Sequence, residues 1–180
     1  MTLFLITAPS GAGKTTLCKK INHWTECVSH TTRPMRSGEQ DGKTYYFVSK
    51  EEFNEIDEQG GFAEKVEYDG NYYGVSVNEL QSKLKDGKIV YIIVEYDGYK
   101  QIKEKYPEAI GIFVYMSKEE CMANMLLRGD SLENAISRIE KYDSEMKNRK
   151  EYDYVIKNVR DKFLSTTHIM ENIISANFKR

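Results

Sequence analysis

Cysteine and proline are scarce in this 180-residue chain, with three of each. The cysteines, Cys18, Cys27 and Cys121, are widely spaced and form neither a CxxC pair nor a Cys/His cluster. This spacing favours free thiols over a zinc site or a disulfide framework. Because a chain without disulfides is typical of a reducing compartment, we expect a cytoplasmic protein.

The chain also lacks long apolar runs and a strong excess of one charge. No stretch approaches the length of a membrane span, and no charged segment followed by an apolar run suggests a signal peptide. Lys and Arg number 26 against 28 Asp and Glu, whereas proteins built mainly to bind nucleic acid carry a clear basic excess. We therefore expect no membrane and no nucleic-acid partner. The choice between a monomer and a homodimer stays open.

Apolar, β-prone runs alternate with helical patterns along the chain. The runs predict strands at Leu3–Thr7, Val28–Thr31, Tyr45–Val48, Phe62–Tyr68, Ile89–Glu95, Ile110–Met116 and Tyr154–Ile156. Caps and periodicity predict helices at about 14–24, 50–58, 76–85 (ending at Gly87), 99–105, from 117 onward, 132–149 and 161–176. This alternation predicts a doubly wound α/β fold with a parallel sheet.

The region from Thr32 to Tyr73 interrupts that alternation and indicates an inserted β-rich subdomain. We therefore expect one domain whose core spans about 1–31, 76–116 and 150–180, with an insertion at about 32–75 and a helical lid at about 120–145.

A glycine-rich turn follows the first predicted strand. It reads Ala8-Pro9-Ser10-Gly11-Ala12-Gly13-Lys14-Thr15 and opens a helix, which is the context that a phosphate-binding P-loop requires. Gly11 and Gly13 let backbone N–H groups point at phosphate oxygens, and the helix N-terminus adds partial positive charge. We expect Lys14 to reach the β- and γ-phosphates of ATP, the Thr15 hydroxyl to bind Mg²⁺, and Thr16 to complete the site. The pattern alone does not distinguish kinase, GTPase and ATPase.

Three further motifs follow this turn in order. The first is Ser29-His30-Thr31-Thr32-Arg33, which is followed by Arg36, Gly38, Glu39, Gly42 and Tyr45. The second is Gly70-Asn71-Tyr72-Tyr73-Gly74, which is preceded by Phe62 and Glu64. The third is the run 151–158, which ends in Asn158. With the P-loop, they resemble the guanylate kinase family over nearly the whole chain. The resemblance implies a Mg²⁺-dependent enzyme that transfers phosphate from ATP to GMP or dGMP, giving ADP and GDP or dGDP.

The acceptor phosphate carries about two negative charges near pH 7, so it needs paired cations. Arg33 and Arg36 are close in sequence, and arginine suits bidentate phosphate contacts. The resemblance implies that these two arginines hold the phosphate of GMP together with the hydroxyls of Tyr45 and Tyr73.

Guanine presents a ring N–H and an exocyclic amine on one edge, and a buried carboxylate can accept both. The resemblance assigns this carboxylate to Glu64, assisted by Ser29 and by Glu95, where the family has Asp. Glu95 also stands where P-loop proteins place an acidic residue near Mg²⁺; the alternative is an uninvolved charge at the strand end.

Phosphoryl transfer requires charge neutralisation and exclusion of water, which a mobile lid with arginines supplies. Arg128 precedes Gly129, and Arg138 lies in the next predicted helix. The resemblance implies that both clamp the transferred phosphate, although Arg138 could instead belong to a solvated helix face. It places Asn158 near adenine or ribose.

The chain departs from the family pattern at several positions. Val75 replaces a Ser or Thr that can contact the base, Asp97 replaces Gln, and Met125 replaces an arginine of the lid. These changes leave a kinase for another nucleoside monophosphate as an alternative. A non-catalytic interaction module of the same fold is a second alternative, which the intact P-loop opposes.

Overall fold

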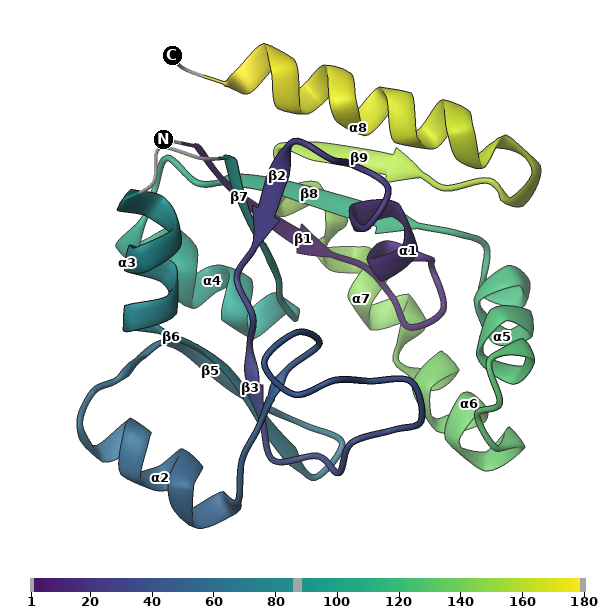
Figure 1. Ribbon diagram of the computed structural model, residues 1–180. Coiled ribbons are helices and arrows are strands. Elements are labelled where there is room, and N and C mark those ends of the chain that lie inside the picture. The colour runs from purple at the N-terminus through teal and green to yellow at the C-terminus, as the bar shows by residue number, and fades with distance from the viewer. Residues whose placement is uncertain (1, 86–88, 179–180) are drawn as a thin grey trace.

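The computed structural model describes residues 2–85 and 89–178, and these form two sheets with flanking helices (Figure 1). The central sheet has the strand order β2-β7-β1-β8-β9, and all its neighbouring strands are parallel. Its strands are β1 (Thr2–Thr7), β2 (Trp24–Glu26), β7 (Ile89–Ile93), β8 (Ile110–Tyr115) and β9 (Tyr154–Lys157). A parallel sheet of this kind confirms the predicted α/β class.

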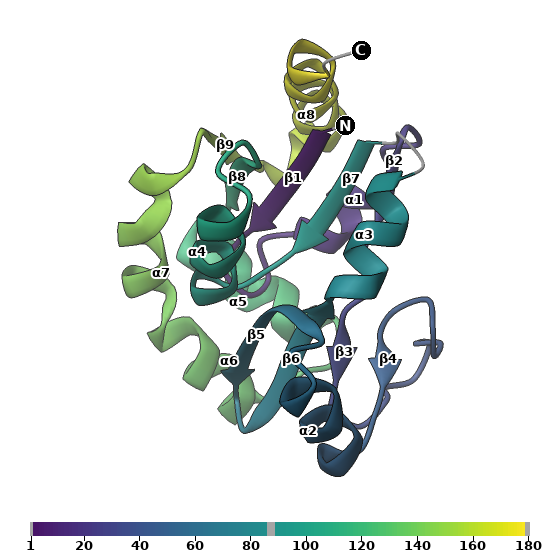
Figure 2. The same ribbon diagram turned by 90° about the vertical axis from the view of Figure 1, so that its left-hand side faces the viewer.

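The central sheet is buried on both faces, which explains its near-continuous apolar strands. In β1, Phe4 and Ile6 face one hydrophobic cluster, whereas Leu3 and Leu5 face the other. The first cluster is covered by α1 (Lys14–Cys18) and α8 (Phe163–Asn177), and the second by α3 (Val77–Lys85) and α4 (Tyr96–Lys105) (Figure 2). Helices on both faces make the sheet doubly wound.

The second sheet has the order β4-β3-β6-β5. Its strands are β3 (His30–Thr31), β4 (Tyr46–Phe47), β5 (Phe62–Tyr68) and β6 (Asn71–Ser76), and α2 (Lys50–Glu58) lies beside it at the end of the molecule farthest from α8 (Figure 1). The sheet begins at His30 rather than at Thr32, because β3 pairs with β4 and β6 and not with the central sheet. The chain enters it through residues 27–29 and leaves it from Ser76 directly into α3.

Two capping boxes start helices where the sequence predicts them. Ser49 and Glu52 exchange side-chain and backbone hydrogen bonds at the start of α2. Ser117 and Glu120 do the same at the start of α5 (Lys118–Leu127). Each box satisfies N–H groups that a helix start leaves unpaired.

The predicted helix 14–24 is wrong beyond Cys18, where α1 ends. Trp24 instead begins β2, and its ring packs against Tyr91 at 4.2 Å. Its indole N–H donates a hydrogen bond to the Cys18 carbonyl oxygen at 2.9 Å. Local propensity favours further helical turns after Cys18, but the burial of Trp24 in the central core requires the chain to form β2 instead.

The single predicted helix 132–149 is also wrong. It is divided at Lys141 into α6 (Leu132–Glu140) and α7 (Tyr142–Asn148), followed by η1 (Arg149–Glu151). The Tyr142 hydroxyl donates a hydrogen bond to the Met116 carbonyl at 2.7 Å, and the Tyr142 ring packs on the central core. This anchor draws α7 toward the end of β8 and bends the chain at Lys141.

Two smaller differences concern the central helices. Helix α4 begins at Tyr96 rather than Tyr99, because Glu95 already has the extended conformation of an N-cap residue. A short turn, η2 (Arg160–Lys162), precedes α8. The predicted helix end at Gly87 lies outside the described residues. In the part of the chain that the structure describes, no helix combines the length and apolar character needed to cross a membrane.

Candidate functional site

A cavity of about 770 Å³ lies where the carboxyl ends of β1 and β7 meet the second sheet and the α5–α6 region. Ligands bind at this edge of open α/β sheets. Its walls include the whole loop from Ala8 to Thr16 together with Asn158, the acceptor residues Ser29, Arg33, Arg36, Tyr45, Glu64, Tyr73 and Glu95, and the clamp residues Arg128 and Arg138. The structure thus brings together every residue to which the sequence assigned a role, while those roles stay predictions.

The phosphate loop needs glycine at two points. Gly11 and Gly13 have φ angles of 82° and 81°, in the left-handed region that side chains rarely adopt. A Cβ at Gly11 would lie 2.3 Å from the Cys121 carbonyl oxygen, and one at Gly13 would lie 2.7 Å from Nδ2 of Asn158. The loop is therefore packed against α5 and against the residue that follows β9.

Two amides hold this loop in place. Asn158 is buried and donates to the carbonyl of Ala12 at 3.0 Å, and its Oδ1 atom has no hydrogen-bond partner in the part of the chain that the structure describes. Asn124 of α5 donates to the carbonyl of Gly11 at 2.8 Å and accepts from Arg160 at 2.8 Å. Sequence reasoning missed Asn124 and Arg160, because neither lies in a motif and their contacts join distant parts of the chain.

Lys14 and Glu95 meet beside the loop, with 3.7 Å between Nζ and Oε1. The carboxylate of Glu95 and the hydroxyl of Thr15 are the hard oxygen donors that Mg²⁺ prefers. Among the described residues no three His, Cys, Asp or Glu side chains form a metal-binding cluster. Protein oxygens of this kind hold Mg²⁺ only when substrate phosphates supply further ligands, which fits a nucleotide site.

The acceptor segment forms an aromatic and cationic cage. The Arg33 guanidinium lies 5.5 Å from the ring centre of Tyr45, and the Tyr45 and Tyr73 rings lie 5.9 Å apart. Burial raises the pKa of Tyr45 to about 12, and Tyr73 adds to this shift, so the hydroxyl keeps its proton and can donate to an anion.

Glu39 organises both arginines of this cage. Its Oε1 atom pairs with Arg33 at 2.8 Å, and its Oε2 atom accepts the backbone N–H of Arg36 at 2.7 Å. Burial is the largest single influence and lowers the pKa of Arg33, but the hydrogen bond and charge of Glu39, together with Tyr73 and Tyr45, outweigh it in sum and leave that pKa raised. Glu39 lies within the acceptor motif, yet its type and position alone did not reveal this role.

Glu64 is the buried carboxyl of the site, with 4% of its surface exposed. Burial raises its pKa from 4.5 to about 7, against the hydrogen bond that it accepts from the Val75 N–H at 2.9 Å. Gly98 of α4 makes room for it, because a Cβ there would lie 2.6 Å from Oε2. The Val75 side chain is fully buried in the core, so at this position the backbone N–H is the group that contacts Glu64.

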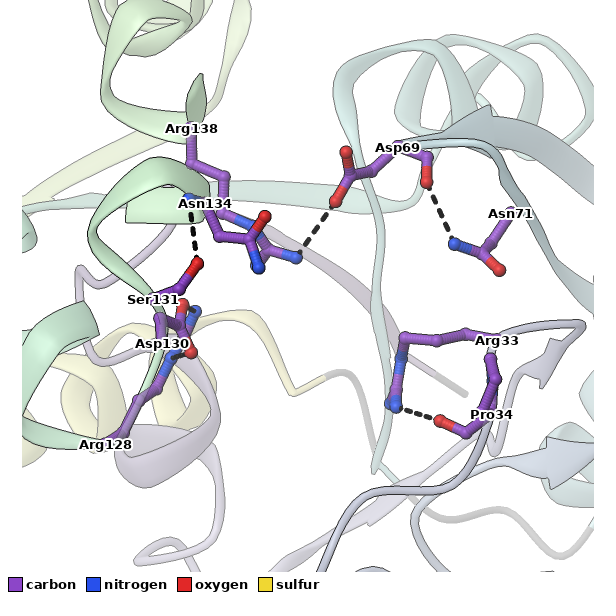
Figure 3. A network of polar contacts seen from close by, with 9 residues as sticks. All are labelled: Arg33, Pro34, Asp69, Asn71, Arg128, Asp130, Ser131, Asn134 and Arg138. Carbon is purple, nitrogen blue, oxygen red and sulfur yellow. Dashed lines mark hydrogen bonds and ion pairs between the residues drawn. The ribbon is translucent and has the colours of Figure 1, made fainter. Parts of the chain in front are cut away.

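The two clamp arginines are held by carboxylates (Figure 3). Arg128 forms two bonds with Asp130, at 2.6 and 2.9 Å. Arg138 donates to Asp69 at 3.3 Å, and its buried Nε atom has no hydrogen-bond partner among the described residues. Met125, at the position where the resemblance implies an arginine, is fully buried in α5 and therefore packs inside the protein instead of facing the cavity.

Glu145 of α7 is a further acid that sequence reasoning missed. It lines a smaller cavity of about 210 Å³ together with Ala8 and Glu95. Burial raises its pKa to about 7, and the charge of Glu95 adds to the shift. In the sequence, Glu145 lies among charged residues whose spacing is typical of a solvent-exposed helix face. Its buried position is therefore evident only from the fold.

Comparison with known proteins agrees with this arrangement. The family model described as guanylate kinase matches residues 1–177. The chain is 37% identical to a guanylate kinase of Alkalilimnicola ehrlichii, covering 99% of this chain and 90% of that protein. It is 39% identical to a guanylate kinase of Lactococcus lactis, covering 99% and 89%. The crystal structure of guanylate kinase from Anaplasma phagocytophilum superimposes with a TM-score of 0.80 at 28% identity, covering 99% of this chain and 87% of that one. The chain therefore belongs to the guanylate kinase family.

Proposed function

We propose that this chain transfers the γ-phosphate of ATP to GMP, giving ADP and GDP. The observation that carries this proposal is the single cavity that joins a phosphate loop to a cationic cage and a buried carboxyl. The guanylate kinases to which the chain is similar support the same reaction. Since the base and phosphate contacts do not involve the 2′ position of the sugar, the proposal includes dGMP.

ATP binds through the loop from Ala8 to Thr16, whose N–H groups and helix N-terminus favour phosphate. When the nucleotide binds, the Lys14 ammonium leaves Glu95 and pairs with the β- and γ-phosphates. Thr15 and Glu95 would hold Mg²⁺ beside the phosphates, where the ion would supply positive charge that offsets theirs. Asn158 lies in the cavity wall beside the loop, where it borders the adenosine part of ATP.

GMP binds on the opposite side. Arg33, Arg36, Tyr45 and Tyr73 hold its phosphate through charge-assisted and hydroxyl hydrogen bonds. The ionised Glu64 accepts the ring N–H and the amine of guanine, and Ser29 and Glu95 border the same base.

Transfer requires little beyond positioning and charge neutralisation. The attacking phosphate oxygen is already ionised, so no side chain has to remove a proton. Arg128 and Arg138 neutralise the phosphoryl group in flight. We propose that residues 32–75 close over GMP and that residues 120–145 form the lid that excludes water. The three cysteines are buried free thiols, which supports a reducing, cytoplasmic environment.

The test is an ADP-release assay with GMP, dGMP, AMP, CMP, UMP and dTMP as acceptors. We expect turnover with GMP and dGMP and a preference of about 10⁴-fold over the other bases, because they leave Glu64 unpaired. If only the monophosphate of another base is phosphorylated, that nucleotide replaces GMP as the proposed acceptor. If none of them is phosphorylated, the result favours a non-catalytic interaction module.

Arg36→Ala separates the two nucleotide sites. It should raise the KM for GMP by about 10-fold or more and leave the KM for ATP nearly unchanged, since a charge-assisted contact contributes about 1.5–3 kcal/mol. Arg149→Ala, an exposed arginine outside the cavity, is the matched control. A large loss of ATP affinity in Arg36→Ala would contradict the acceptor-side assignment.

A further inference from the structure

Three arginines of the site are paired with carboxylates, but one of these pairs differs from the others. Arg33 and Arg128 find their partners within a few residues, in Glu39 and Asp130. Arg138 of α6 instead pairs with Asp69, which lies in the second sheet (Figure 3). This ion pair therefore joins the lid region to the part of the chain that carries the acceptor residues.

Asp69 occupies the tip of the hairpin formed by β5 and β6, which we call the acceptor hairpin (62–76). Asp69 and Gly70 have φ angles of 55° and 72°, the left-handed pair of a tight hairpin turn. The Asn71 side chain donates to the Asp69 carbonyl at 2.9 Å. The carboxylate is therefore presented from a fixed turn rather than from a loose loop.

A second contact lies next to this pair. The Lys141 ammonium, at the junction of α6 and α7, lies 4.4 Å from the ring centre of Tyr68, within the range of a cation–π interaction. Tyr68 also lines the cavity. Two successive hairpin residues thus meet two cations of the lid region, Arg138 and Lys141.

The Asp69 pair restrains Arg138 without using all its donors. The bond is long at 3.3 Å and involves one of five N–H donors, while the buried Nε atom of Arg138 finds no partner within residues 2–85 and 89–178. Only 15% of the Arg138 side chain is exposed, against 48% for Asp69. The guanidinium thus keeps a desolvated donor for an anion in the cavity that it lines.

The acceptor hairpin also carries two residues that contact GMP in the proposed function. Glu64 lies in β5 and Tyr73 in β6, and β5 and β6 are paired up to the turn that holds Asp69. Binding of the base and phosphate therefore fixes the strands, and the strands fix the carboxylate that faces Arg138.

We propose that Asp69 is a positioning residue for phosphoryl transfer. It holds the Arg138 guanidinium at the junction of hairpin and lid, so that closure of the hairpin on the acceptor delivers this guanidinium to the phosphate being transferred. The phosphate then takes the donors that Asp69 leaves free. This inference rests on the role of Arg138 in the proposed function.

The test is Asp69→Asn, because asparagine adopts the left-handed turn but lacks the charge. We expect kcat to fall about 3- to 30-fold, the size of effect typical of residues that couple two sites. The KM values for GMP and ATP should change less than about 2-fold, and Asp69→Glu should recover part of the loss. Glu67→Gln, which removes an exposed carboxylate from the same hairpin, is the matched control and should retain full kcat.

Epistasis separates positioning from a general structural effect. In an Arg138→Ala background, assayed at high enzyme concentration, Asp69→Asn should cause no further loss. An equal loss in both backgrounds, or unchanged kcat for Asp69→Asn in the otherwise unmodified chain, would overturn the inference. Full activity of Arg138→Ala would instead overturn the role of Arg138 itself and the inference with it. Thermal unfolding reports whether Asp69→Asn folds, and Asp69→Gly, which also fits the turn, provides a second variant.

Discussion

Replacement of Glu64 by Gln gives a prediction whose size can be worked from the structure. The Glu64 carboxyl is buried, accepts one hydrogen bond from the Val75 N–H, and has its pKa raised from 4.5 to about 7, first by burial. Between these two pH values the folded protein keeps a proton that the unfolded chain has lost. Glu64 therefore lowers the stability of the wild-type protein as pH rises through this window.

The full penalty is about 3 kcal/mol above pH 7, at about 1.36 kcal/mol for each pH unit between the two pKa values. Glu64→Gln has no carboxyl to ionise, so its stability relative to wild type should rise by that amount between about pH 4 and about pH 8. In thermal unfolding this corresponds to about 6–12 °C for a chain of this size. In Glu64→Gln the side-chain amide N–H near Gly98 is left without a hydrogen-bond partner, which lowers the stability of the variant by the same amount at every pH. The pH dependence of the stability difference is therefore the quantity that tests the argument.

Urea unfolding of both proteins across this pH range measures the difference directly. Wild type and Glu64→Gln should also differ in activity, and in the direction opposite to their difference in stability. In wild type, kcat/KM for GMP should rise with pH toward about 7 as Glu64 ionises, whereas Glu64→Gln should lose about 5- to 150-fold and show no such rise. A stability difference independent of pH would refute the argument that Glu64 is held as a desolvated acid.

Two further predictions concern the phosphate loop. Lys14→Met should abolish transfer while thermal unfolding and circular dichroism stay close to wild type, because Lys14 lies in the cavity wall and not in the core; persistent turnover would contradict the ATP assignment. Gly11→Ala should lower the Tm by about 5 °C or more, since its Cβ would lie 2.3 Å from the Cys121 carbonyl at a φ of 82°. A Tm within about 1 °C of wild type would show that the loop is not packed against α5.

Features specified by neighbouring residues could be predicted from the sequence. The capping boxes at Ser49 and Ser117 start helices where expected, since each consists of residues three apart. The glycine pattern of the loop, with Gly11 and Gly13, predicts a turn that only positive φ angles allow. The parallel sheet follows from apolar strands that alternate with helices.

Features specified by distant contacts could not be predicted. Trp24 ends α1 through a core contact with Tyr91, and Tyr142 divides α6 from α7 through a bond to Met116. Such packing contributes more to the free energy of folding than local helix propensity does, so it decides where these helices end.

The site shows the same division between local and distant information. The residues to which motifs assigned a role all line one cavity, whereas Asn124 and Arg160, which line it too, were missed. Asp69, the carboxylate that holds Arg138, was assigned no role because the two residues are far apart in the chain. The position of Val75 shows a further limit: a motif identifies the residue but not the direction of its side chain.

The two chain crossings between the sheets, at residues 27–29 and at Ser76, have a mechanical consequence. If the second sheet turns as one body, these crossings are its pivot, and displacement grows with distance from them. Ser29 lies at the pivot and Glu64 lies beside Gly98 of α4, so these two residues move least. Asp69, at the far tip of the hairpin, travels the longest arc, so a small rotation of the sheet is amplified into a large displacement beside α6.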